Sequence, residues 1–151
     1  GSTTTTALSE ALSMFRRAEG IAYELDPRSL WLAEECNNIG SVLQQQGNLG
    51  ESLVYYRKAV SLQQVRAPDS CVLAVTYGYM ASVLTEQNYL PEALAYHHKA
   101  AGIQQKRSPN SLSLALTYSN IALVLRKQGN LAGSLAFFRK AKDIQRSLPK
   151  Y

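Results

Sequence analysis

Hydrophobic residues along the chain follow a helical rather than a strand pattern. Between residues 29 and 46 they recur with a period near 3.6, which predicts an amphipathic helix. Gly47-Asn48 then supplies a tight turn, because both residue types tolerate a positive φ. A second segment with an apolar inner stripe covers about 49–66. The pattern therefore predicts a helix–turn–helix hairpin.

This hairpin recurs along the chain with a fixed period of about 41 residues, a length typical of helical repeat units. Pro27, Pro68 and Pro109 are equally spaced by this period, each in a short polar break. Between residues 29–69 and 111–151, 18 of 41 positions are identical. Such a period is the signature of a repeat array in which each unit covers the apolar face of the next.

The array predicted from this period is one half repeat followed by three whole ones. Residues 7–25 match only the second helix of a repeat, since Leu12 and Phe15 align with its inner stripe. We expect seven helices in a single all-α domain over 7–151, divided into 7–28, 29–69, 70–110 and 111–151. Residues 1–6 are interpreted as a tag remnant and a flexible lead-in outside the fold.

The residue types at the helix ends and at the contacts between helices agree with this repeat pattern. Ser29, Ser70 and Ser111 are predicted N-caps, and Asn88 replaces glycine in the middle turn. Small residues are predicted where paired helices approach closely: Gly40, Ala81, Ala122, Ser52, Ala93 and Ser134. Large residues fill the gaps between helices. Of the histidine pair, His98 is assigned to such a packing position and His97 to the outer surface.

The repeat resembles the tetratricopeptide repeat. The segments that carry the resemblance are Asn38-Ile39-Gly40, Gln46-Gly47-Asn48-Leu49, Tyr55-Tyr56-Arg57-Lys58-Ala59 and their counterparts in 120–141. The length of the repeat is similar to that of the long form found in kinesin light chain. The resemblance implies a right-handed α-α superhelix. It also implies a concave groove, lined by the first helix of each repeat, that holds extended or helical peptides.

Carrying the family's groove positions onto this sequence gives fifteen candidate binding residues. They are Glu34, Asn37, Asn38, Ser41, Gln45, Val75, Gly78, Tyr79, Ser82, Glu86, Leu116, Ser119, Asn120, Leu123 and Lys127. Asn38 and Asn120 stand where the family uses an amide to grip a peptide backbone, and an amide offers both donors and an acceptor. Gly78 has two interpretations: it relieves crowding against a neighbouring helix, or it admits a ligand side chain.

Composition and charge exclude several other functions. The 151 residues carry a net charge of +5 without a long basic run, so nucleic-acid binding is disfavoured. No apolar stretch is long enough to span a membrane. Cys36 and Cys71 lack the spacing of a metal site and are interpreted as free thiols, which favours a reducing, cytoplasmic compartment. We find no phosphate loop and no carboxylate paired with a histidine or cysteine, so neither a cofactor nor enzymatic activity is expected.

The sequence leaves two functions open. The first is a scaffold that holds a peptide or protein segment in the groove. The alternative is a homo-oligomer that assembles through apolar residues on the terminal helices, namely Leu8, Leu12, Leu135 and Ile144. A third, weaker hypothesis is nucleic-acid binding through basic residues on the second helices.

Overall fold

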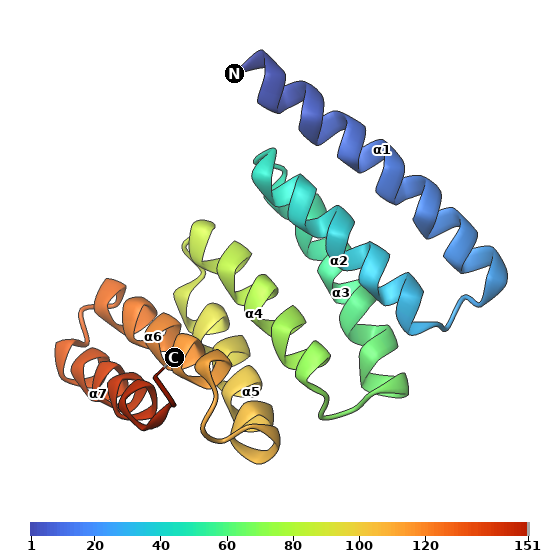
Figure 1. Ribbon diagram of the computed structural model, residues 1–151. Helices are drawn as coiled ribbons and strands as arrows, with labels where there is room; N and C mark the ends of the chain where they lie inside the picture. The colour runs from blue at the N-terminus through green and yellow to red at the C-terminus, as the bar shows by residue number, and fades with distance from the viewer. Residues whose placement is uncertain (151) are drawn as a thin grey trace. The chain divides into compact units, whose positions relative to one another are not determined.

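The computed structural model describes residues 1–150, which form seven helices and no strand (Figure 1). The helices are α1 (Ser2–Leu25), α2 (Leu30–Gln45), α3 (Leu49–Arg66), α4 (Cys71–Glu86), α5 (Leu90–Arg107), α6 (Leu112–Lys127) and α7 (Leu131–Ser147). The predicted all-α class and number of helices are confirmed. The chain divides after Pro68 into two compact units. The first contains α1–α3, and the second contains α4–α7.

The first helix begins earlier than the sequence pattern predicted. We expected residues 3–6 to lie outside the fold, but α1 is helical from Ser2. The side chains of Thr5 and Thr6 donate hydrogen bonds to the carbonyl groups of Gly1 and Ser2, four residues earlier. Such bonds to the carbonyl group four residues earlier are compatible with a helix, although they do not strengthen it.

Serine side chains cap the first helix of every whole repeat. The hydroxyl of Ser29 accepts a hydrogen bond from the backbone N–H of Leu32 at 3.0 Å. Ser70 and Ser111 make the equivalent bonds at 3.2 and 3.1 Å. Each bond satisfies an N–H that has no partner within the helix, so the predicted N-caps are confirmed.

The turns between paired helices use the backbone conformation that the sequence predicted. Gly47 and Gly129 have φ of 82° and 83°, and Asn88 has φ of 65°. This left-handed conformation is free of strain for glycine, and asparagine tolerates it better than most other residues. The middle repeat therefore makes the same turn without a glycine.

Small residues allow the two helices of a hairpin to approach closely. The hydroxyl of Ser52 donates to the carbonyl oxygen of Gly40 at 2.7 Å, and Ser134 donates to Ala122 at 2.7 Å. A Cβ placed on Gly40 would lie 2.8 Å from the ring of Tyr56. The large tyrosine ring at this contact therefore requires the absence of a side chain on the facing helix.

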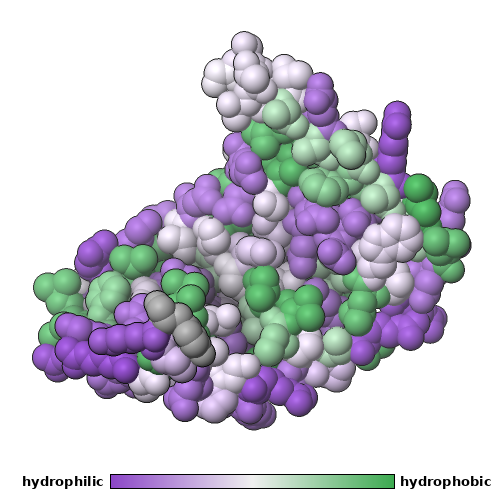
Figure 2. Space-filling view, in the orientation of Figure 1, coloured by the Kyte–Doolittle hydropathy of each residue, from purple (hydrophilic) through white to green (hydrophobic). Residues whose placement is uncertain are grey.

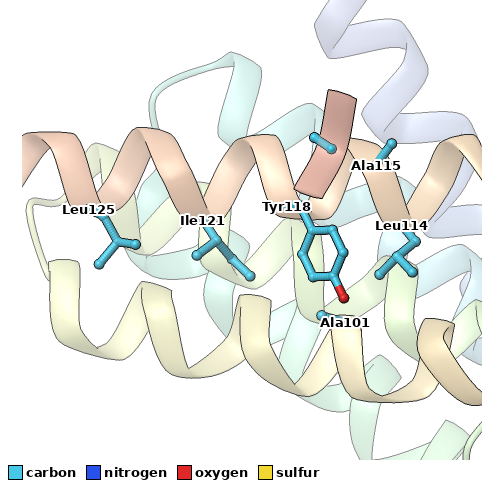
Figure 3. Close-up of a cluster of buried hydrophobic side chains, with 7 residues drawn as sticks. Ala101, Leu114, Ala115, Tyr118, Ile121 and Leu125 are labelled. Carbon is cyan, nitrogen blue, oxygen red and sulfur yellow. The ribbon is translucent and has the colours of Figure 1, made fainter. Parts of the chain in front are cut away.

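Each unit has its own hydrophobic core. In the second unit, seven buried side chains from α5, α6 and α7 pack together (Figure 3). They are Ala101, Leu114, Ala115, Tyr118, Ile121, Leu125 and Ala141. The core of the first unit contains Ala22, Leu32, Ala33, Cys36 and Ala59. Both cores join the first helix of a repeat to second helices on its two sides.

The structure corrects the assignment of the two histidines. His97 is buried, with 4% of its surface exposed, whereas His98 is exposed. His97 lies one repeat period after Tyr56 and one before Phe138, so it occupies the packing position that we had assigned to His98. The prediction was one residue out of register, and on a helix one residue turns a side chain by about 100°.

The contact at Gly40 leads to a stability prediction. Gly40→Ala should lower the free energy of unfolding by about 1–3 kcal/mol, because the new methyl group overpacks the Tyr56 ring. Gly50→Ala is the matched control, since a Cβ there meets nothing within 4 Å. It should leave stability unchanged or raise it by up to about 1 kcal/mol. Urea unfolding of both variants measures the difference, and equal effects would contradict the assigned contact.

Candidate functional site

The fifteen predicted groove residues lie on α2, α4 and α6, the first helices of the three whole repeats. All of them are exposed or half-buried. On α4 they lie three, four, seven and eleven residues after Val75, so they share one face of the helix. The buried residues of the same helix, such as Ala74 and Met80, lie on other faces.

Six of these residues converge on one pocket in the second unit. The pocket has a volume of about 240 Å³. Its predicted members are Gly78, Ser82, Glu86, Asn120, Leu123 and Lys127, and it also contains Thr85, His97 and Val124. Three helices therefore build it: α4 and α6 provide the two walls, and α5 provides His97. We call it the groove pocket.

The groove pocket combines polar, charged and apolar groups. Asn120 contributes an amide that can both donate and accept, and Leu123 adds an exposed apolar side chain. Glu86 and Lys127 carry opposite charges. The pocket is therefore not a site for a small anion alone, and its mixed chemistry suits a polypeptide backbone with side chains of more than one kind.

Gly78 opens the groove pocket rather than relieving a crowded contact. A Cβ added to Gly78 would meet nothing within 4 Å, in contrast to Gly40. Of the two interpretations that the sequence left open, the structure contradicts crowding. Glycine within a helix is unfavourable by about 1 kcal/mol relative to alanine. The space beside Gly78 is left to a ligand or to solvent.

His97 forms the part of the groove pocket contributed by α5. Burial, followed by repulsion from the neighbouring His98, lowers the pKa of His97 from 6.5 to about 4. The imidazole is thus neutral near pH 7 and offers one donor and one acceptor. Because we placed His97 on the outer surface, the sequence missed this member of the site. Counting one full repeat period from Tyr56 would have found it.

In the first unit, a buried carboxylate organises the corresponding face of α2. Glu35 accepts a hydrogen bond from Trp31 Nε1 at 3.1 Å and one from Asn38 Nδ2 at 3.5 Å. Glu35 is 8% exposed. The sequence analysis did not single out Glu35. Comparison of the repeats could have done so, because Glu35 is a charged residue at a position where the later repeats carry Thr76 and Thr117.

The two asparagines predicted to grip a peptide therefore have different surroundings. Asn38 is tied to Glu35, whereas Asn120 lines the groove pocket. Of the other predicted residues in the first unit, Gln45 donates to the hydroxyl of Ser41 at 3.4 Å, and Glu34 is exposed. The residues that line the groove pocket all belong to the second unit.

Residues 1–150 contain neither a metal-binding cluster nor a helix suited to a membrane. No three histidine, cysteine or acidic residues gather closely enough to hold a metal ion. None of the helices described has both the length and the apolar character needed to cross a membrane.

Comparison with protein families gives two matches. A tetratricopeptide repeat profile matches residues 72–147, about half of the chain, and a second one matches residues 36–65. The chain belongs to the tetratricopeptide repeat family. Comparison with curated proteins gives no match.

Solved structures share the fold of this tetratricopeptide repeat protein. One is BtubC (BKLC) from P. vanneervenii, with a TM-score of 0.87, 20% identity and 97% of this chain covered. This chain spans 61% of that protein's length. Another is a putative kinesin light chain with nearly identical repeats from Podospora anserina. It has a TM-score of 0.83 and 14% identity, with 97% of this chain and 72% of that chain covered. The fold is thus that of a tetratricopeptide-like solenoid, typical of non-enzymatic interaction scaffolds.

His97 leads to a prediction about pH. The unfolded chain binds a proton at this histidine more readily than the folded chain, so the free energy of unfolding falls as the pH drops below 6.5. With a folded-state pKa of about 4, the expected loss between pH 7 and pH 5 is roughly 1–2 kcal/mol. Urea unfolding at the two pH values measures it.

The control for this prediction is His97→Phe, which introduces the residue type that Phe138 provides in the third repeat. This variant should lose most of the difference between pH 7 and pH 5. An unchanged difference would show that other groups cause the pH dependence.

Proposed function

We propose that this scaffold binds a peptide segment of a partner protein in the groove pocket and along the neighbouring faces of α4 and α6. The observation that carries the proposal is the convergence of six predicted groove residues on one pocket. Membership of the tetratricopeptide repeat family supports the general role of a protein-interaction scaffold. The pocket supports the location that we propose for this role.

The chemistry of the two helix faces defines the segment that fits. Asn120 can hydrogen-bond to a peptide group of the ligand, and the open space at Gly78 receives a small side chain. Val75, Tyr79 and Leu116 are each 42–54% exposed on the same faces. They offer apolar contact area for further ligand side chains. We expect a mostly apolar segment rather than a highly charged one.

Substitution of Asn120 tests the proposal with peptides selected from a random display library on the unmodified protein. Asn120→Ala should weaken their binding severalfold to about tenfold, because one hydrogen bond to the ligand is lost. The melting temperature should not change, since Asn120 is exposed. The matched control is Asn110→Ala, at an exposed asparagine in the break before α6. If the selected peptides bind Asn120→Ala as well as they bind Asn110→Ala, the binding site lies outside the groove pocket.

Gly78 provides a second test with the same peptides. Gly78→Ala should raise the free energy of unfolding by up to about 1 kcal/mol through its helix propensity. It should also weaken peptide binding, because the methyl group takes up space in the pocket. Isothermal titration calorimetry together with thermal unfolding separates the two effects. Gly102→Ala on α5 is the control, since it adds a methyl group in open space outside the groove pocket.

The exposed face of α1 favours self-association with a second copy of the chain as a second candidate function. Leu12 and Phe15 are only half-buried, whereas their counterparts on α3, Leu53 and Tyr56, are buried. Met14 is 69% exposed, and Figure 2 shows hydrophobic surface along α1. On the other terminal helix, Leu135 is exposed, while Ile144 packs against the core. This candidate therefore rests on α1.

Light scattering over a range of protein concentrations tests this second function. Self-association through α1 predicts a mass that rises with concentration, because burying its apolar residues between copies is favourable. Leu12→Glu should remove the increase, whereas Thr6→Glu, at an exposed position on the same helix, should not. A constant monomer mass at high concentration would contradict the candidate.

A further inference from the structure

The first unit contains a second pocket, which none of the predicted groove residues line. It has a volume of about 540 Å³ and lies between α1, α2 and α3. Its main lining residues are Glu19, Gly20, Tyr23, Cys36, Lys58 and Leu62. Gly20, Tyr23 and Lys58 are exposed, so a ligand can reach it from solvent.

In the second unit, a tyrosine ring fills the corresponding space. Tyr118 lies two repeat periods after Cys36. Its ring is buried between α5 and α7, 5.7 Å from the ring of Phe137, with Lys140 Nζ 5.6 Å from its centroid. Gln105 Nε2 donates a hydrogen bond to its hydroxyl. Figure 3 shows the ring reaching from α6 toward Ala101 on α5.

The first unit keeps much of this socket but lacks the ring. Lys58 corresponds to Lys140, and the two side chains lie similarly: Lys58 Nζ is 4.5 Å from the Tyr55 ring centroid, and Lys140 Nζ is 4.8 Å from that of Phe137. Four other pairs have matching or similar residues at two periods' distance, namely Gly20 and Gly102, Pro27 and Pro109, Leu32 and Leu114, and Leu62 and Ile144. At two further positions the first unit has the larger Glu19 and Tyr23 in place of Ala101 and Gln105. These side chains take part of the space that the Tyr118 ring fills, and the pocket beside Cys36 is what remains open.

The groups that remain in the socket suit a ring with a hydroxyl group. Burial, with a contribution from the charge of Glu19, raises the pKa of the Cys36 thiol to about 11, so the thiol stays uncharged near pH 7. The thiol lies 4.0 Å from the Glu19 carboxylate. Lys58 offers a cation to a ring face, and Glu19 offers an acceptor for a phenolic O–H. An aliphatic ligand would use neither group.

We propose that the first unit binds the phenol ring of a tyrosine side chain, presented by a partner polypeptide, in the socket at Cys36. The bound ring lies in the pocket beside Cys36, near the place that Tyr118 occupies in the second unit. Its hydroxyl donates to Glu19, and Lys58 lies near the ring. This site is separate from the groove pocket and does not depend on peptide binding there.

Nuclear magnetic resonance titration of the ¹⁵N-labelled protein tests the proposal with two probes, 4-methylphenol and N-acetyl-tyrosine amide. Both should cause saturable shifts at the backbone amides of Gly20 and Ser61, with a Kd on the order of 1 mM for so small a ligand. The absence of saturable shifts there would overturn the proposal. Binding of 4-methylphenol alone would show a small-molecule site and would overturn the assignment to a tyrosine side chain.

Three variants make the test specific. Cys36→Tyr supplies the missing ring and should weaken binding of both probes at least tenfold while raising the melting temperature. Cys71→Tyr, at the exposed cysteine, is the matched control and should bind as the unmodified protein does. Tyr118→Cys should create a second socket, with new shifts at Gly102. Unchanged binding in Cys36→Tyr would overturn the proposal even if Tyr118→Cys does not fold.

Discussion

The close contact between the two helices of each hairpin is the constraint on which the rest of the structure depends. At this contact the first helix of every hairpin carries glycine or alanine, and the second helix carries serine or alanine. In two of the three hairpins a serine hydroxyl also donates to the facing backbone carbonyl at 2.7 Å. A larger residue at either position would push the helices apart and expose the core behind them.

Because this contact recurs in every whole repeat, each position of the frame can be compared between repeats. Where the residue type is kept, as at the serine N-caps, the local structure is repeated. Where it changes, the protein acquires a feature that only one repeat has. Cys36 in place of a tyrosine leaves a socket, and Gly78 leaves space beside α4. Glu35 in place of a threonine holds Trp31 and Asn38. Both proposed binding sites thus lie where one repeat departs from the residue type of the others.

The two pockets have different physical origins. The groove pocket forms between α4, α5 and α6, and the six predicted residues that line it lie outside the buried core, whereas His97 and Val124 belong to the packed interior. The socket at Cys36 lies within the core pattern itself, at a position that another repeat fills with a buried ring. A ligand there would complete packing that the chain leaves unfinished, whereas a ligand in the groove pocket would add a contact to a finished surface.

The sequence by itself determined the seven helices, their caps, their turns and the small residues at the hairpin contacts, because each depends on local backbone preference or on a repeated spacing. It also placed the groove residues on exposed helix faces. Only the tertiary structure decided which six of them meet in one pocket, since that depends on how α4, α5 and α6 pack. It likewise showed that Asn38 is bound to Glu35, that His97 rather than His98 is buried, and that no neighbour crowds Gly78. The shared pocket and the open space at Gly78 follow from distances between different helices, which a repeat period read along one chain does not contain.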